Sequence, residues 1–153
     1  MSRNHQKSVA GRLVAAARLY RSRVGSALGP VGLHAGQEGI LYALADTDGQ
    51  SMTDLAGTLG VQPPTVTKMV GRLATQGYVQ RRASKTDARQ AQVFLTSGGR
   101  KALNGLDAII EGVEETALSG INGKDRKKLR SLLRQVADNL DGGAAVDDPD
   151  AAE

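Results

Sequence analysis

Two short helical patterns separated by a glycine corner, within residues 52–73, constrain the fold more than any other part of the sequence. Apolar side chains recur at three- and four-residue steps on both sides of the corner, as on one face of a helix. They are Met52, Leu55, Ala56 and Leu59 before it, and Val66, Met69, Val70 and Leu73 after it. Ala56 and Gly60 are small enough to let the two helices approach closely. We therefore predict a helix-turn-helix in preference to two unrelated core helices.

The second helix of this unit carries short polar and cationic side chains where a recognition helix would meet DNA. Pro63 and Pro64 begin it without penalty, because the first turn of a helix needs no backbone donor. Polar side chains near this end can bond base edges or phosphates in the major groove. The candidate DNA contacts are Gln62, Pro64, Thr65, Thr67, Lys68 and Arg72. The sequence leaves open which of them contact bases and which contact phosphates.

The basic stretch RRASKTDARQ, residues 81–90, begins at the end of one short segment of alternating polarity, 78–82, and leads into a second, 91–96. These segments predict a β-hairpin with a basic tip. A run of charge is usually a solvated loop, but a hairpin that follows a recognition helix reaches the DNA backbone and minor groove. Asp87 is close enough to Arg89 to orient its guanidinium. The candidate contacts of this wing are Arg81, Arg82, Lys85, Asp87 and Arg89.

The rest of the chain is expected to be mainly helical. Apolar residues at helical spacing predict helices over residues 6–28, 34–45, 97–118 and 124–140. The spacing in the third of these is typical of helices that pair along their length. DTDGQ, residues 46–50, is expected to be a turn, and residues 142–153 a disordered acidic tail. The predicted fold class is mainly α, an α+β winged helix of about six helices and a small β-hairpin.

The distribution of charge favours a polyanionic partner. Residues 1–23 hold six Lys and Arg side chains and no acid, and residues 61–101 hold eight with Asp87 as their one acid. A local field of one sign can therefore survive folding. No stretch approaches the ~20 apolar residues of a membrane span, and Gly11, Arg12 and Arg18 interrupt the apolar run at the N-terminus. We expect a cytoplasmic protein without membrane contact.

Several chemical functions are disfavoured by composition. The sequence has no cysteine, which excludes disulfides, thiolate nucleophiles and cysteine-ligated zinc. Its two histidines, His5 and His34, cannot form a histidine-rich metal site. Glu114 and Glu115 are adjacent and face different sides of a helix, and residues 97–101 lack phosphate-loop spacing. We expect no enzyme activity, no metal and no cofactor.

Residues 32–46 and 51–103 resemble the MarR family of bacterial winged-helix transcriptional regulators. The resemblance rests on the pattern LA..LGV....VT..V..L...GYV.R, followed by a wing that contains Asp-x-Arg and ends in LT..G. With the flanking helices it covers about residues 6–141. The resemblance implies an intertwined homodimer, with residues 6–30 and 97–141 as the dimerisation region and residues 31–96 as the DNA-binding domain.

The resemblance also implies a function and roles for individual residues. The protein would be a repressor, less often an activator, that leaves a palindromic operator when a small phenolic or carboxylate ligand binds. Arg89 would lie in the minor groove, oriented by Asp87, and Lys85 would lie near the wing tip. The absence of cysteine departs from peroxide-sensing members, and two separated histidines match zinc-sensing members poorly.

Tyr20, Arg23 and His34 are the candidate ligand contacts, offering an aromatic wall, a cation and a titratable donor. His34 could instead cap the helix that follows it. A second function remains open, a winged-helix module that binds proteins without sequence-specific DNA binding. The many cations on the recognition helix and wing argue against it, because protein interfaces are depleted of lysine at their cores.

Overall fold

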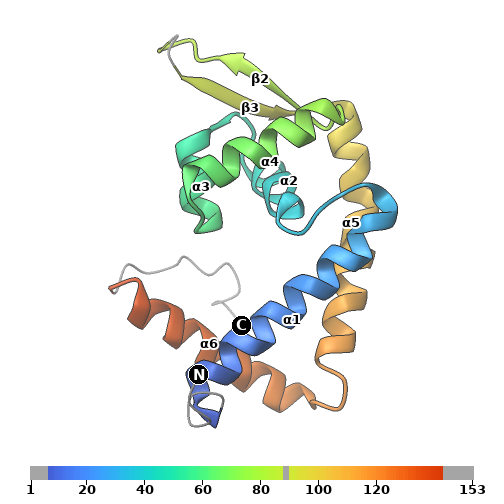
Figure 1. Ribbon diagram of the computed structural model, residues 1–153, viewed down its shortest axis with the longest axis vertical. Coiled ribbons are helices and arrows are strands. Elements are labelled where there is room, and N and C mark those ends of the chain that lie inside the picture. The colour runs from blue at the N-terminus through green and yellow to red at the C-terminus, as the bar shows by residue number, and fades with distance from the viewer. Residues whose placement is uncertain (1–6, 88–89, 143–153) are drawn as a thin grey trace. The chain divides into compact units, whose positions relative to one another are not determined.

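A computed structural model describes residues 7–87 and 90–142, which form helices and one small antiparallel sheet (Figure 1). The chain divides into two compact units, one up to Glu114 and one from Glu115, and α5 crosses the boundary. In chain order the elements are α1 (Val9–Leu28), η2 (Gly29–Val31), α2 (Gln37–Asp46), β1 (Gln50–Ser51), α3 (Met52–Leu59), α4 (Pro63–Thr75), β2 (Val79–Ala83), β3 (Ala91–Leu95), α5 (Ser97–Ala117) and α6 (Gly123–Leu140).

The predicted fold class is confirmed, with two differences from the expected elements. Gln50, expected to end a turn, forms the two-residue strand β1 with Ser51 and pairs with Val93 of β3. Two residues are too few to show an alternating pattern. The helix expected from His34 begins at Gln37, because Gly36 has a φ of 96° and keeps the preceding loop out of helical geometry.

The core of the first unit lies where α2, α3 and α4 pack beneath the hairpin of β2 and β3 (Figure 1). Its fully buried side chains come mostly from the apolar positions that sequence spacing singled out. They include Ile40, Leu41 and Leu44 of α2, Leu55 of α3, Val66, Val70 and Leu73 of α4, and Val93 of β3, with Leu28 of α1 and Leu106 of α5 beside them. The helix-turn-helix is thus held by burial of its own apolar faces.

Local hydrogen bonds determine where α3 begins and how it ends. The Ser51 hydroxyl accepts a bond from the Asp54 amide at 3.1 Å, and the Asp54 carboxylate accepts one from the Ser51 amide at 3.3 Å. This reciprocal pair is a capping box, so Ser51 caps the helix. Gly60 ends α3 with a φ of 61°, a left-handed conformation that favours glycine.

The base of the wing is fixed to the start of α5 through Tyr78. The Thr96 amide donates to the Tyr78 carbonyl oxygen at 3.1 Å, and the Thr96 hydroxyl donates to the Gly77 carbonyl. Gly99 packs so closely that a Cβ there would lie 2.1 Å from the Tyr78 oxygen. Asp48 also connects β3 to α5, because its carboxylate accepts hydrogen bonds from the Leu95 amide at 2.9 Å and from the Arg100 guanidinium at 2.7 Å.

The second unit contains the end of α5 and α6, joined by a turn that Arg126 holds together. Its guanidinium donates to the Glu115 carboxylate at 2.9 Å, to the Ile121 carbonyl at 2.9 Å and to the Leu118 carbonyl at 3.1 Å. Hydrogen bonding to Arg126 and its positive charge lower the pKa of Glu115.

None of the helices in the described parts of the chain is long and apolar enough to span a membrane.

We predict that Gly99→Ala lowers the free energy of unfolding by about 2 kcal/mol or more, because the added methyl group collides with a backbone carbonyl that cannot swing away. Gly57→Ala is the matched control, since it lies in a helix with no heavy atom within 4 Å of the added carbon. It should raise the free energy of unfolding by about 0.5 kcal/mol. Urea titration followed by circular dichroism measures both. Equal effects of the two variants would contradict the close packing at Gly99.

Candidate nucleic-acid interface

One face of α4 is exposed and free of acidic residues. The opposite face buries Val66, Val70 and Leu73, which fixes the rotation of the helix about its axis. The chain has no acidic residue between Asp54 and Asp87. The six residues predicted to contact DNA from the recognition helix, Gln62, Pro64, Thr65, Thr67, Lys68 and Arg72, are all exposed. These six residues are therefore exposed on or next to a helix whose charged side chains, Lys68 and Arg72, are both positive.

The cations of α4 keep their hydrogen-bonding capacity. Within residues 7–87 and 90–142, the side chains of Lys68 and Arg72 form no hydrogen bond or ion pair. Thr67 differs, since its hydroxyl donates to the Pro63 carbonyl at 3.1 Å. Lys68 and Arg72 can therefore bind an external anion without first losing a partner.

The two arginines at the stem of the wing have different neighbours. Successive residues of a strand point to opposite faces of the sheet. Arg81 reaches back to α4, where it donates to the Thr67 carbonyl at 3.4 Å. Arg82 lies over the ring of Phe94, with its guanidinium carbon 4.6 Å from the ring centroid. Both side chains remain exposed, and their contact with phosphates stays a prediction.

The turn of the wing closes through its own backbone. The Ser84 amide donates to the Gln90 carbonyl at 2.8 Å, and the Gln90 amide donates to the Asp87 carbonyl at 3.0 Å. Lys85 is exposed on this turn, as expected. Arg89 lies outside the described residues, so its orientation by Asp87 and its place in the minor groove stay predictions.

His34 lies beside α4, in the loop before α2. It shares a hollow of about 510 Å³ with Lys68, Gly71, Arg72, Thr75 and Gln76. The alternative in which His34 caps α2 is wrong, because Gly36 occupies the capping position and no side chain bonds there. The backbone of His34 is used instead, its amide donating to the Gln37 side-chain oxygen at 2.8 Å.

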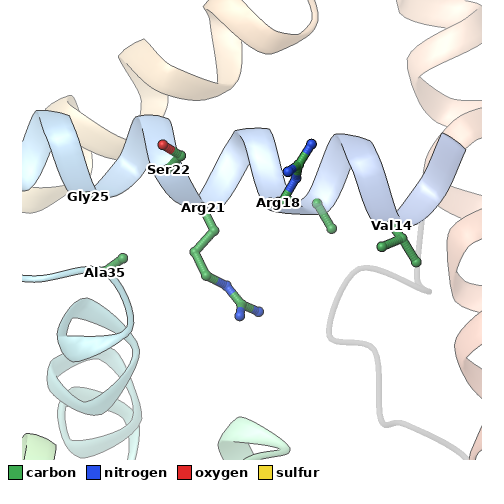
Figure 2. Close-up of a pocket in the computed structure, with 7 residues that line it drawn as sticks. Val14, Arg18, Arg21, Ser22, Gly25 and Ala35 are labelled. Carbon is green, nitrogen blue, oxygen red and sulfur yellow. The ribbon is translucent and has the colours of Figure 1, made fainter. Parts of the chain in front are cut away.

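A second hollow, of about 600 Å³, lies along α1 (Figure 2). Val14 and Arg21 extend from the side of α1 on which Ala35 lies. The lining residues are Val14, Ala17, Arg18, Arg21, Ser22, Gly25 and Ala35. Sequence reasoning missed Arg18 and Arg21, whose side chains extend to different sides of α1 in Figure 2.

The three predicted ligand contacts are not brought together in either hollow. Tyr20 and Arg23 belong to the lining of neither, whereas His34 belongs to the hollow on α4. Tyr20 is partly exposed, and burial, Glu114 and Glu38 raise the pKa of its hydroxyl. The described residues contain no group of three or more His, Cys, Asp or Glu side chains that could hold a metal ion.

The chain is similar in sequence to known regulators of transcription. The model of the MarR family matches residues 33–91. The HTH-type transcriptional regulator YwoH of Bacillus subtilis (strain 168) is 30% identical over 118 residues, which are 77% of this chain and 85% of YwoH.

Two solved structures share the fold. A probable transcriptional regulator from Pseudomonas aeruginosa is 27% identical with a TM-score of 0.79, over 86% of this chain and 98% of that one. BpsR of Bordetella bronchiseptica, whose DNA binding is regulated by 6-hydroxynicotinic acid, is 23% identical with a TM-score of 0.80, over 87% and 95%.

Proposed function

Because the chain belongs to the MarR family of transcriptional regulators, we propose that it binds a palindromic operator as a homodimer and represses genes until a small ligand releases it. The observation that carries this proposal is the exposed, acid-free face of α4 beside a basic hairpin. Residues 31–96 bind DNA in this proposal, and residues 6–30 and 97–141 form the dimer. The relatives are regulators and not enzymes, so no catalytic step is included.

DNA binding is proposed to combine two grooves. The N-terminal half of α4 lies in the major groove, where Gln62, Thr65 and Thr67 approach base edges and Pro64 contacts sugars or thymine methyl groups. Lys68, Arg72, Arg81 and Arg82 contact phosphates. Lys85 and Arg89 reach the adjacent minor groove from the wing, with Asp87 orienting Arg89. Two such half-sites about one helical turn apart would match a two-fold dimer.

We predict that Lys68→Ala and Arg89→Ala each weaken binding to the DNA upstream of the gene by about tenfold, and lower the salt dependence of log K by about one. Lys101→Ala is the control, because it removes an exposed cation of α5 from the same unit. Fluorescence anisotropy at several salt concentrations, with a random duplex for comparison, measures these effects. Binding without salt dependence, or without preference over the random duplex, would refute the proposed function.

Dimerisation is supported by apolar side chains that each unit leaves exposed. In α6 no residue is buried, and the exposed fractions of Leu132 and Leu133 are 48% and 43%. Leu129 and Leu140 extend the same row at helical spacing. In α1, Val9, Val14 and Leu19 are exposed as well. The exposed apolar row of α6 is the kind of surface that marks a protein interface.

We predict that Leu132→Asp converts the dimer into monomers, because it places a charge in the apolar row of α6. Ser131→Asp adds the same charge on the opposite face of the helix and should leave the dimer intact. Sedimentation velocity measures the assembly state, and anisotropy should show at least tenfold weaker operator binding for Leu132→Asp. A Leu132→Asp protein that stays dimeric would contradict the assignment of α6 to the interface.

The ligand is proposed to be a small aromatic acid or its thioester that binds along α1. The hollow there combines apolar walls from Val14 and Ala17 with the cations Arg18 and Arg21, a combination that suits an amphipathic anion. BpsR, which shares the fold, responds to an aromatic acid. Tyr20 and Arg23 lie on the same helix and remain proposed contacts.

We predict that a thermal-shift screen of small aromatic acids and their thioesters identifies a compound that stabilises the protein and releases the operator. At a concentration 100 times its Kd it should add about 2.7 kcal/mol to the stability. Loss of this shift in Arg21→Ala assigns the ligand to the hollow, whereas loss in Arg23→Ala alone assigns it to the residues predicted from sequence. A compound whose shift survives in both variants would contradict both sites.

A further inference from the structure

The hollow beside α4 differs from the rest of the candidate interface because part of its wall comes from outside the helix-turn-helix and wing. His34 belongs to the loop between η2 and α2, whereas the other lining residues lie on the second half of α4 or directly after it. Gly71 has no side chain, which leaves room between Lys68 and Thr75. The result is a concave surface of about 510 Å³ on the same exposed face as Lys68 and Arg72.

The chemistry of this hollow suits an anion with several oxygen atoms. Lys68 and Arg72 carry fixed positive charge, and the imidazole of His34 supplies a donor. No acidic residue is among the lining residues that the structure describes. In residues 7–87 and 90–142, the side chains of His34, Lys68 and Arg72 have no hydrogen-bonding or ionic partner. Three adjacent donor groups are therefore available at one place.

The loop that carries His34 is held firmly against the domain. The Gln37 side-chain oxygen accepts from the His34 amide at 2.8 Å, and the Glu38 carboxylate accepts from the Gly36 amide at 2.7 Å. At the other end of the loop, the Gln76 side-chain amide donates to the Gly32 carbonyl. The imidazole is thus attached to a backbone whose position relative to α4 is fixed before any ligand binds, which lowers the entropy cost of binding.

We propose that this hollow is a phosphate site, in which His34, Lys68 and Arg72 together hold one phosphate of the DNA backbone. The inference rests on the proposed function, because it takes DNA as the partner of the exposed face of α4. It assigns His34 to the DNA interface and not to the ligand-binding site predicted from the sequence. It also extends that interface beyond the recognition helix and wing, to the loop before α2. A phosphate held from two elements fixes the orientation of α4 in the groove.

The test is operator binding by a series of substitutions at His34, measured by fluorescence anisotropy. His34→Ala should weaken binding by about threefold to tenfold, as for the loss of one ordinary hydrogen bond. His34→Glu should weaken it further, because a carboxylate repels the phosphate, whereas His34→Lys should restore wild-type affinity. A purely structural role of His34 would not be rescued by lysine. Thr47→Ala, an exposed position at the opposite end of α2, is the control.

Two further measurements separate the possible failures. Thermal unfolding of each variant identifies any that fails to fold, and the Lys and Glu variants keep the test valid if His34→Ala is unstable. If Arg72→Ala weakens binding while all His34 variants match Thr47→Ala, the phosphate site is overturned and the proposed function stands. If Lys68→Ala, Arg72→Ala and Arg89→Ala all bind as the wild type does, the proposed function itself fails.

Discussion

Burial of the inner face of α4 is the constraint on which the rest of the first unit depends. Val66, Val70 and Leu73 pack against α2 and α3, and none of them retains any exposed surface. A helix with three such anchors over two turns cannot rotate about its axis without opening the core. The same packing that stabilises the domain therefore decides that Lys68 and Arg72 face outward. Stability and the proposed DNA contact are two consequences of one apolar stripe.

The wing depends on a second, more local constraint at its base. Tyr78 precedes β2, and its carbonyl oxygen receives the Thr96 amide and lies against Gly99. Asp48 joins β3 to α5 by accepting from Leu95 and Arg100. Since β2 and β3 pair along five residues each, fixing their base also limits how the stem can tilt. The cations of the stem are thus carried by a hairpin whose origin is rigid, even though the side chains themselves are exposed.

The parts of this fold that sequence predicts are those with repeated signals. Helical spacing in α3 and α4 and the corner at Gly60 predict the helix-turn-helix, and the structure confirms it. β1 was missed because two residues carry no periodicity. The start of α2 was placed three residues early, because sequence does not show that Gly36 adopts a positive φ. Hollows depend on side chains that are distant in sequence, so neither the residues that share a hollow with His34 nor the hollow beside Arg21 could be predicted.

The loop before α2 connects the two hollows by a single peptide bond. Ala35 lines the hollow on α1, where a Cβ at Gly25 would come within 3.4 Å of its side chain, and His34 lines the hollow on α4. A ligand in the hollow on α1 would therefore contact a residue directly bonded to His34. In the proposed function, the ligand and a DNA phosphate would contact adjacent residues of one loop, and any coupling between the two binding events would act equally in both directions. Hydrogen bonds at Gly32, His34 and Gly36 hold this loop in place, so a ligand that displaced Ala35 would have to overcome them.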